Sequence, residues 1–446
     1  MSGRIKVTLA VILMACALNL SAQQRPVPVG PITSDQFRTT FVRLGNSDEG
    51  LLYEPLNPGA NARVGLVLAH PAEDVLANLP VQEMAKRGYR VLAVNHHGDT
   101  TDMAVFAQPL SHAIGYLRTL PGVQHVVIMG HSGGGPLMAW YQNIAEHGPA
   151  ACQGPEKIYP CDAEQLSNLA KPDGIIILDA TLGAFHDMSA IDPAVNGDKR
   201  ETSLDMFSAA NGYDTGTGSA KYSPDFAKRF YAAQSARNAS IVDNAIARLN
   251  ALNQGKAQFT DDEPLLIRGM GVEAAGARLY QPDPSFAAHT KSPHTLLKAD
   301  GTQPVVIVNS VRPPTGQQFA KSLDALNVMN KNTTVRKFLT SAAIRTGPDY
   351  AITADDIVGV DWASATTATP GNAEGITVPA LILSNTCHYL IVPDEIIFNH
   401  LASKDKTLVY NEGAVHGFTP CRPEFGDTVK RAFDYLDGWL SKPERF

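Results

Sequence analysis

The chain has 446 residues, of which 44% are hydrophobic and 18% are charged, so it can bury a sizeable core. Its formal net charge of −7 argues against a nucleic-acid partner, because such proteins usually carry a basic surface, and the sequence shows no basic stripe. We therefore expect a globular protein that does not bind nucleic acid.

The first 22 residues have the composition of a signal peptide. Two basic residues precede an apolar run from Val7 to Leu20, and the small pair Ser21-Ala22 follows. This run is short for a transmembrane anchor, so we expect export to the periplasm or beyond, with no integral membrane span after processing. An alternative is a lipoprotein, because residues 13–16 resemble a bacterial lipoprotein cleavage box that would place a lipid anchor on Cys16.

Four cysteines remain once residues 1–22 are removed. An even number of cysteines in an oxidising compartment favours disulfides, although four cysteines permit three pairings. The close pair Cys152 and Cys161 would clip one surface loop, and Cys387 and Cys421 would then join two loops near the C-terminus.

Apolar strand-like runs alternate with helical patterns from about residue 50 to residue 180. The predicted strands are Leu51–Tyr53, Val64–Ala69, Arg90–Val94, Val126–Met129 and Gly174–Leu178. The predicted helices lie near residues 81–87, 106–120 and 137–141. Continuous apolar strands separated by helices indicate parallel strands that are buried on both faces. The pattern predicts a doubly wound, mostly parallel α/β sheet, whose sites lie at the carboxyl ends of the strands.

The alternation stops for a long stretch after Gly174–Leu178, which takes the place of the sixth core strand of the expected fold. Residues 181–376 are polar and rich in Gly and Pro, with a long helical pattern after Ser223-Pro224 and a candidate added strand at Pro304–Val308. We expect this insertion to form a lid or cap over the site, because structureless loops of such length are disfavoured. The alternative is that the insertion lies on the surface, remote from the catalytic residues.

The core pattern resumes at about residue 377, with strands at Ala380–Ser384 and Thr407–Tyr410 and a last helix at Thr428–Leu440. The expected organisation is therefore a signal peptide (1–22), a first core part (23–180), a lid (181–376) and a second core part (377–446).

Ser132 is predicted to lie on a sharp turn between a strand and a helix. The apolar run Val126–Met129 ends in Gly130-His131-Ser132-Gly133-Gly134, and a helical segment follows. Glycine is needed at positions 130 and 134, where a side chain would collide with the backbone of so tight a turn. The helix would direct backbone N–H groups, that of Gly133 first, toward developing negative charge. A chance G-x-S-x-G match is the alternative, but such matches rarely fall in this context.

A serine hydroxyl is a weak nucleophile until an imidazole takes its proton and a carboxylate holds that imidazole in one tautomer. His416 is the predicted base, because it lies between Gly413 and Gly417 on a loop that follows a core strand. A surface or capping histidine is the alternative.

The chain resembles the α/β-hydrolase superfamily over about residues 50–180 and 378–442. The resemblance is carried by the elbow Gly130–Gly134, by His70-Pro71 in place of the usual His-Gly, and by the late loop Gly413–Phe418. The order of serine first and histidine late is the superfamily's own. The resemblance implies a serine hydrolase that needs no cofactor, and its motifs do not distinguish the members.

The acid departs from the usual pattern. The loop after Ala380–Ser384, where the superfamily commonly places it, holds no carboxylate. Asp179 ends the preceding core strand, and platelet-activating-factor acetylhydrolases and chlorophyllases, which are similar in this respect, place their acid there. Glu395 and Asp394 are alternatives, although capping and the helix dipole also explain acids at a helix start. We predict that Asp179 is the acid; the alternative for Asp179 is a hydrogen bond to the local backbone. If Asp179 is the acid, a Cys387–Cys421 bond would fix the approach of the base.

The first oxyanion donor is expected to be the Gly133 N–H. The second should follow His70, and because Pro71 has no N–H, the Ala72 N–H is predicted. A cluster of histidines and aspartates at residues 96–102 could suggest metal ligands, but adjacent residues at a strand end usually point apart, so no metal site is predicted.

The sequence therefore predicts an exported hydrolase of carboxylic esters that works through an acyl-enzyme on Ser132. A lactone, amide or carbon–carbon bond hydrolase is an alternative, because the predicted triad of Ser132, His416 and Asp179 does not specify the bond that is cut. A catalytically silent, hydrolase-like binding protein is the alternative from another class, and the missing conventional acid is its only support.

Overall fold

The computed structural model describes residues 34–45, 48–96, 102–197, 199–271, 276–315 and 330–446. The predicted signal peptide and Cys16 lie outside these residues, as do positions 97–101 of the histidine- and aspartate-rich loop. Within the described ranges, none of the helices combines the length and the apolar character that crossing a membrane requires.

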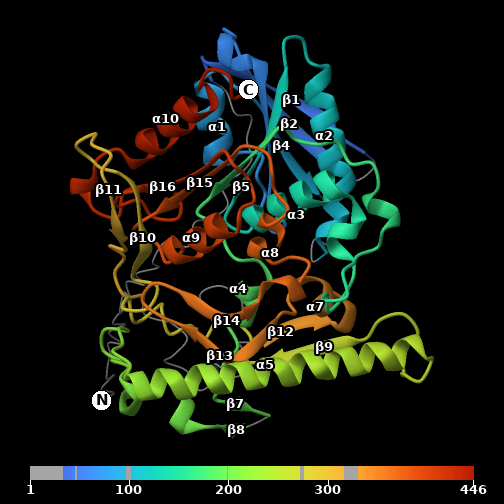
Figure 1. Cartoon of the computed structure of the whole chain (residues 1–446), viewed down its shortest axis with the longest axis vertical. Coiled ribbons are helices and arrows are strands. Elements are labelled where there is room, and N and C mark those ends of the chain that lie inside the picture. Colours follow the sequence, from blue (N-terminus) through green and yellow to red (C-terminus); the bar gives the residue numbers. More distant parts are fainter. Residues whose placement is uncertain (1–33, 46–47, 97–101, 198, 272–275, 316–329) are drawn as a thin grey trace, which may run out of the picture.

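A ten-stranded sheet lies at the centre of the described structure, with strand order β1-β2-β4-β3-β5-β6-β15-β16-β10-β11 (Figure 1). Its strands are β1 (Phe37–Arg43), β2 (Asp48–Pro55), β3 (Val64–Ala69), β4 (Arg90–His96), β5 (His125–His131), β6 (Gly174–Leu178), β10 (His289–Leu297), β11 (Val305–Asn309), β15 (Ala380–Asn385) and β16 (Lys406–Asn411). The strands from β4 through β10 in this order are parallel, whereas β1, β2 and β11 pair antiparallel with their neighbours. The predicted mostly parallel α/β sheet is confirmed.

Successive residues of the central strands alternate between two hydrophobic cores, one on each face of the sheet. Val67, Ile128 and Ile177 belong to one core, whereas their neighbours Val127 and Ile176 belong to the other. A parallel sheet must be covered on both faces, which explains why β3, β6 and β15 are buried at every position.

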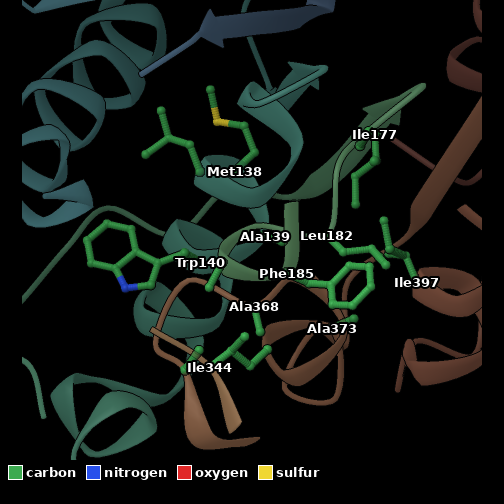
Figure 2. Close-up of a cluster of buried hydrophobic side chains, with 14 of the residues drawn as sticks. Met138, Ala139, Trp140, Ile177, Leu182, Phe185, Ile344, Ala368, Ala373 and Ile397 are labelled. Carbon is green, nitrogen blue, oxygen red and sulfur yellow. The ribbon is translucent and has the colours of Figure 1, made fainter. Parts of the chain in front are cut away.

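Helices cover both faces. The helices among the described residues are α1 (Leu79–Lys86), α2 (Ala107–Thr119), α3 (Gly134–His147), α4 (Ala184–Met188), α5 (Pro224–Asn253), α7 (Val335–Ser341), α8 (Thr369–Ala373), α9 (Ile391–His400) and α10 (Thr428–Leu440). Side chains of α1 and α10 belong to one core, and side chains of α2, α3 and α9 belong to the other. Figure 2 shows Ile177 of β6 and Ile397 of α9 near Phe185, in the core that also contains Met138 of α3 and Ile344.

Residues 181–376 contribute to two parts of the molecule. The hairpin of β10 and β11 extends the main sheet, because Thr295–Leu297 pairs in parallel with Val409–Asn411. The strand predicted at Pro304–Val308 is therefore present as β11. The rest of the segment holds α4, α5, α7, α8 and three two-stranded sheets, formed by β7 (Val195–Asn196) with β8 (Lys199–Arg200), β9 (Pro264–Arg268) with β12 (Asn330–Thr334), and β13 (Arg345–Ile352) with β14 (Ile357–Asp361).

The long predicted helix is α5, which crosses the end of the molecule opposite α1 and α10 (Figure 1). Ser223 is its N-cap, because the Ser223 hydroxyl accepts a hydrogen bond of 3.2 Å from the Phe226 N–H, and Pro224 occupies the first turn. Its apolar side chains face the segment's own small sheets, since Tyr231 packs edge-on against Tyr350 of β13.

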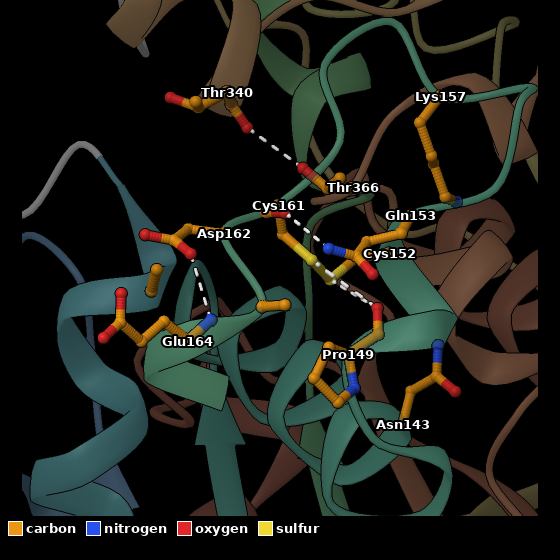
Figure 3. Close-up of a disulfide and its surroundings, with 12 residues drawn as sticks. Asn143, Pro149, Cys152, Gln153, Lys157, Cys161, Asp162, Glu164, Thr340 and Thr366 are labelled. Atoms are coloured by element: carbon orange, nitrogen blue, oxygen red, sulfur yellow. Dashed lines mark hydrogen bonds between the residues drawn. A yellow bond between two sulfur atoms is a disulfide. The ribbon is translucent and has the colours of Figure 1, made fainter. Parts of the chain in front are cut away.

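The cysteines form the two pairs that the sequence favoured. Cys152 and Cys161 clip the loop after α3, where both sulfur atoms lie near the Pro149 carbonyl (Figure 3). Cys387 and Cys421 join the loop after β15 to the loop after β16, with Cα atoms 6.4 Å apart. The second pair therefore ties together the two loops that carry His388 and His416.

Candidate active site

Ser132 lies on the turn between β5 and α3, with its backbone in the left-handed region at φ 58°. A Cβ at Gly130 would collide with the Gly134 carbonyl, and a Cβ at Gly134 would lie 2.6 Å from the Ala69 carbonyl oxygen. The two glycines are therefore needed for the steric reason that the sequence suggested. The Ser132 N–H donates to the Leu178 carbonyl at 3.0 Å, which anchors the turn to β6.

His416 and Asp179 are in direct contact. The Nδ1 atom of His416 lies 2.6 Å from Oδ2 of Asp179, which has no exposed side-chain surface, whereas 34% of the His416 side chain is exposed. The other carboxylate oxygen of Asp179 accepts the Asn385 N–H at 3.1 Å. Burial alone would raise the pKa of Asp179, but its contacts with His388 and His416 outweigh this and hold the pKa well below its usual range. The carboxylate is therefore ionised and can stabilise a positive charge on His416.

His131 links the elbow to His416. Its ring centroid lies 4.5 Å from that of His416, and its Nε2 atom donates to the His416 carbonyl at 3.0 Å. Burial, and then the charge of a protonated His416, lower the pKa of His131 to about 3. Because His131 directly precedes Ser132, this neutral imidazole places the His416 ring against the elbow.

His388 is a site residue that the sequence reasoning did not assign. Its Nδ1 atom lies 2.8 Å from the same Oδ2 of Asp179, and its ring stacks on His416 with centroids 4.4 Å apart. The His416 ring thus lies between the rings of His131 and His388. The available signal was the position of His388, in the loop where the superfamily usually carries its acid.

Asp179, His388 and His416 are also a set, within the described residues, whose ligand atoms could hold a metal ion, since these atoms lie within 4.8 Å of one another. Coordination at His416 Nδ1 would replace the hydrogen bond to Asp179 that a catalytic base needs. A metal ion here would therefore compete with triad chemistry.

The two alternative acids make other contacts. The Oδ1 atom of Asp394 accepts the Ala180 N–H at 3.1 Å, and burial followed by the charge of Asp179 raises the pKa of Asp394 well above its ordinary value. Glu395 binds the start of β10, where it accepts the backbone N–H groups of Lys291 and Ser292 and contacts His294 at 2.8 Å. Asp394 thus holds the strand end that carries Asp179, and Glu395 holds β10 in the sheet.

The predicted oxyanion donors differ in their surroundings. Gly133 is the N-cap residue of α3, so its N–H lies at the positive end of that helix. The Ala72 N–H donates to His70 Nδ1 at 3.0 Å, and the Glu73 N–H donates to the same atom at 3.0 Å. The Ala72 N–H is therefore already hydrogen-bonded to His70 and is not a free donor for an oxyanion.

The described residues of the histidine- and aspartate-rich loop have separate structural partners. His96 Nδ1 contacts Asp48 across the β2–β4 pair, and Asp102 caps the turn before α2 by accepting the Ala104 N–H at 2.9 Å.

Residues 181–376 contact the loop that carries His388. The Ser310 hydroxyl lies within hydrogen-bonding distance of the Thr386 and His388 carbonyls, at 3.2 and 3.3 Å, and the Val311 N–H donates to the Thr386 carbonyl at 2.8 Å. A small cavity of about 20 Å³ lies nearby, and one of its walls is Tyr389, whose ring lies 4.2 Å from that of His388. Its other lining residues, most of them from the 181–376 segment, are Leu182, Phe185, His186, Ser189, Tyr280, Ala287, Ile352, Ile357, Leu390 and Pro393.

No protein-family model matches the chain, and no curated protein matches it. Among solved structures, the chain is similar to a siderophore hydrolase, EstB, from Aspergillus fumigatus, with 9% identity over 92% of this chain and 100% of that chain and a TM-score of 0.42. It is also similar to a soluble variant of the monoglyceride lipase from Saccharomyces cerevisiae, with 12% identity over 94% and 99% of the two chains and a TM-score of 0.41. A dienelactone hydrolase from Anabaena variabilis has 9% identity over 91% and 96%, with a TM-score of 0.35.

The fold is established by the chain's own strand order and by the strand–turn–helix elbow at Ser132. On both grounds, the described part of the chain has the α/β-hydrolase fold.

Proposed function

We propose that this protein is an exported serine hydrolase that cleaves carboxylic esters. The observation that carries the proposal is the 2.6 Å contact between His416 Nδ1 and a fully buried Asp179, made beside a strained serine elbow. His131 adds support, because its ring contact with His416 brings the base to the residue that precedes Ser132. A serine, a histidine and an ionised aspartate in this arrangement can activate the serine hydroxyl.

In the proposed reaction, Ser132 Oγ attacks the ester carbonyl carbon and its proton passes to His416 Nε2. Asp179 keeps the other ring nitrogen protonated and stabilises the imidazolium. The tetrahedral intermediate collapses when the carbon–oxygen bond to the alcohol breaks and the alcohol takes the proton from His416. Water then attacks the acyl-enzyme with His416 as base, releasing the acid and restoring Ser132. No cofactor is needed for these steps.

We further propose that residues 181–376, apart from the β10–β11 hairpin that extends the main sheet, act as a cap that bounds the substrate site. The hydrogen bonds of Ser310 and Val311 to the His388 loop support this role. Export is supported by the two disulfides, because such bonds persist in oxidising compartments.

The direct test of the proposal is labelling with a fluorophosphonate probe, which reacts with an activated serine. We expect the parent protein to be labelled and Ser132→Ala to remain unlabelled, with Ser167→Ala, which removes an exposed hydroxyl, as the matched control. Hydrolysis of p-nitrophenyl esters from short to long acyl chains should follow the same order. An unlabelled parent that turns over no ester would favour a binding protein, and labelling of Ser132→Ala would exclude Ser132 as the nucleophile.

Removing the Cys387–Cys421 bond should affect both stability and activity. The bond closes a loop of 34 residues, so the paired serine variant should lose about 3.8 kcal/mol of unfolding free energy. Its kcat should also fall by about tenfold or more, because small misplacements of a base are costly and this bond connects the loops of His388 and His416.

The matched control is the Cys152→Ser/Cys161→Ser variant, whose bond spans 9 residues in a loop remote from the elbow. It should lose about 2.6 kcal/mol and keep its kcat. Urea titrations and ester hydrolysis measure both properties, and an equal loss of kcat in the two variants would contradict a positional role for Cys387–Cys421.

A further inference from the structure

The imidazole of His70 is held in one tautomer by the backbone. Its Nδ1 atom accepts two hydrogen bonds, from the Ala72 and Glu73 N–H groups, each of 3.0 Å. Backbone N–H groups can only donate, so Nδ1 carries no proton, and the neutral ring carries its hydrogen on Nε2. Burial is the main reason that the pKa of His70 lies below its ordinary value; the Glu73 carboxylate opposes this shift and a protonated His416 adds to it.

The Nε2–H of His70 is a buried donor that has no hydrogen-bond partner among the described residues. A buried donor without an acceptor destabilises the folded protein, so such a group calls for an explanation. One explanation is that the donor forms its hydrogen bond only in the transition state. Interactions that are made only in the transition state accelerate a reaction.

The position of this atom is set by Gly133, the residue after the nucleophile. An ideal Cβ built on Gly133 would lie 2.9 Å from His70 Nε2. Since a Cβ lies about 2.5 Å from the nitrogen of its own residue, His70 Nε2 lies no more than about 5.4 Å from the Gly133 nitrogen. Two donors that each lie about 2.9 Å from one oxygen can stand up to about 5.8 Å apart. The separation of the two nitrogen atoms therefore permits one oxyanion to lie within hydrogen-bonding distance of both.

We propose that the His70 Nε2–H, and not the Ala72 N–H, is the second donor of the oxyanion hole beside the Gly133 N–H. The proposal rests on the serine-hydrolase function proposed above. The Ala72 and Glu73 N–H groups act one step away, because their bonds to Nδ1 keep the Nε2 hydrogen directed toward Gly133. Glycine at position 133 leaves the space that the imidazole needs.

Two substitutions of His70 distinguish donation by Nε2 to the oxyanion from support of the loop by Nδ1. Asparagine at position 70 can accept from the N–H groups two and three residues on, as Asx turns do, but its side chain does not extend to the Nε2 position. Glutamine can place an amide donor near the Nε2 position but lacks an acceptor at Nδ1. If His70 only supported its loop, His70→Asn would be the milder change; if it donates to the oxyanion, His70→Gln would be.

The experiment compares p-nitrophenyl ester hydrolysis by the parent, His70→Asn, His70→Gln and the control His147→Asn, which alters a histidine at the far end of α3. We expect His70→Asn to lower kcat by about 100- to 1000-fold with KM and Tm near the parent values, as for loss of one oxyanion donor. His70→Gln should retain more activity than His70→Asn, and His147→Asn should match the parent. Affinity for a trifluoromethyl ketone, whose adduct carries an oxyanion, should fall by the same factor as kcat/KM.

A His70→Asn variant that keeps a third or more of the parent kcat, or the reverse order of the two variants, would overturn the proposal. Should His70→Asn not fold, the parent labelled with ¹⁵N-histidine is titrated with the ketone instead. The Nε2–H proton resonance of His70 must then move downfield, and an unchanged resonance overturns the proposal. If the parent shows no turnover that depends on Ser132, both the proposed function and this inference are wrong. If the parent does show such turnover and His70→Asn has the parent kcat, only this inference is wrong.

Discussion

His416→Ala is expected to lower kcat for a p-nitrophenyl ester by about 10⁶-fold, because removal of one member of a Ser-His pair costs about as much as removal of the whole triad. Without His416, the Ser132 proton has no acceptor and the departing alcohol has no donor. The neighbours cannot substitute for it: His131 donates its Nε2 hydrogen to the His416 backbone, and burial lowers the pKa values of both His131 and His388.

Steady-state hydrolysis by the purified variant measures this loss, and a discontinuous assay over hours is needed to reach it. His400→Ala is the matched control, since His400 lies at the end of α9 and pairs with an exposed Glu374. We expect its kcat to equal that of the parent. If His416→Ala keeps more than about 1% of the parent kcat, another group must serve as the base and the proposed mechanism is wrong.

Asp179→Asn is expected to lower kcat by about 10⁴-fold with little change in fold, because an amide at this position favours the wrong tautomer of the base. The parent carboxylate can only accept from His416 Nδ1, whereas asparagine can present its NH₂ group to that atom. The Nε2 atom of His416 would then carry the hydrogen and could not take the proton of Ser132.

The alternative acids supply the comparison. Asp394→Asn keeps an oxygen for the Ala180 N–H and replaces a carboxyl whose raised pKa already favours the neutral form, so its kcat should stay within about threefold of the parent. Glu395→Gln should lower the unfolding free energy through its contacts with β10 and leave the kcat of the folded protein similar. A collapse of kcat in Glu395→Gln but not in Asp179→Asn would reverse the assignment.

The central strands were predictable because their sequences are apolar without interruption. β3, β6 and β15 are buried at every residue, and such runs between helical patterns leave little freedom of interpretation. β1 and β10 were not predicted, because strands at the edge of a sheet or next to it need not be apolar at every residue. β1 has only two buried residues, and β10 carries Pro293 and several polar residues, which a strand near an edge tolerates.

The residues of the candidate site were predictable where local backbone chemistry demands them. The glycines at positions 130 and 134 mark the elbow by sterics alone, and Asp179 was favoured because the usual acid loop is empty of carboxylates. The placement of His388 against Asp179 was not predictable, since it depends on β6 and β15 being neighbours in space. The occupation of the Ala72 N–H by His70 was missed for a similar reason, because a histidine ring folding back on its own loop leaves no periodic signal.

The adjacency of β6 and β15 also has a kinetic consequence. Their pairing closes a loop of about 200 residues, whereas β5 and β6 close one of about 50, and the longer closure costs about 1.3 kcal/mol more chain entropy, or about tenfold in the closing equilibrium. A refolding chain can therefore assemble the strands that carry Ser132 and Asp179 before it recruits the block that delivers His416. Catalytic competence is then the last property the chain acquires, and a chain arrested before that step would expose the sheet edge to which β15 should bind.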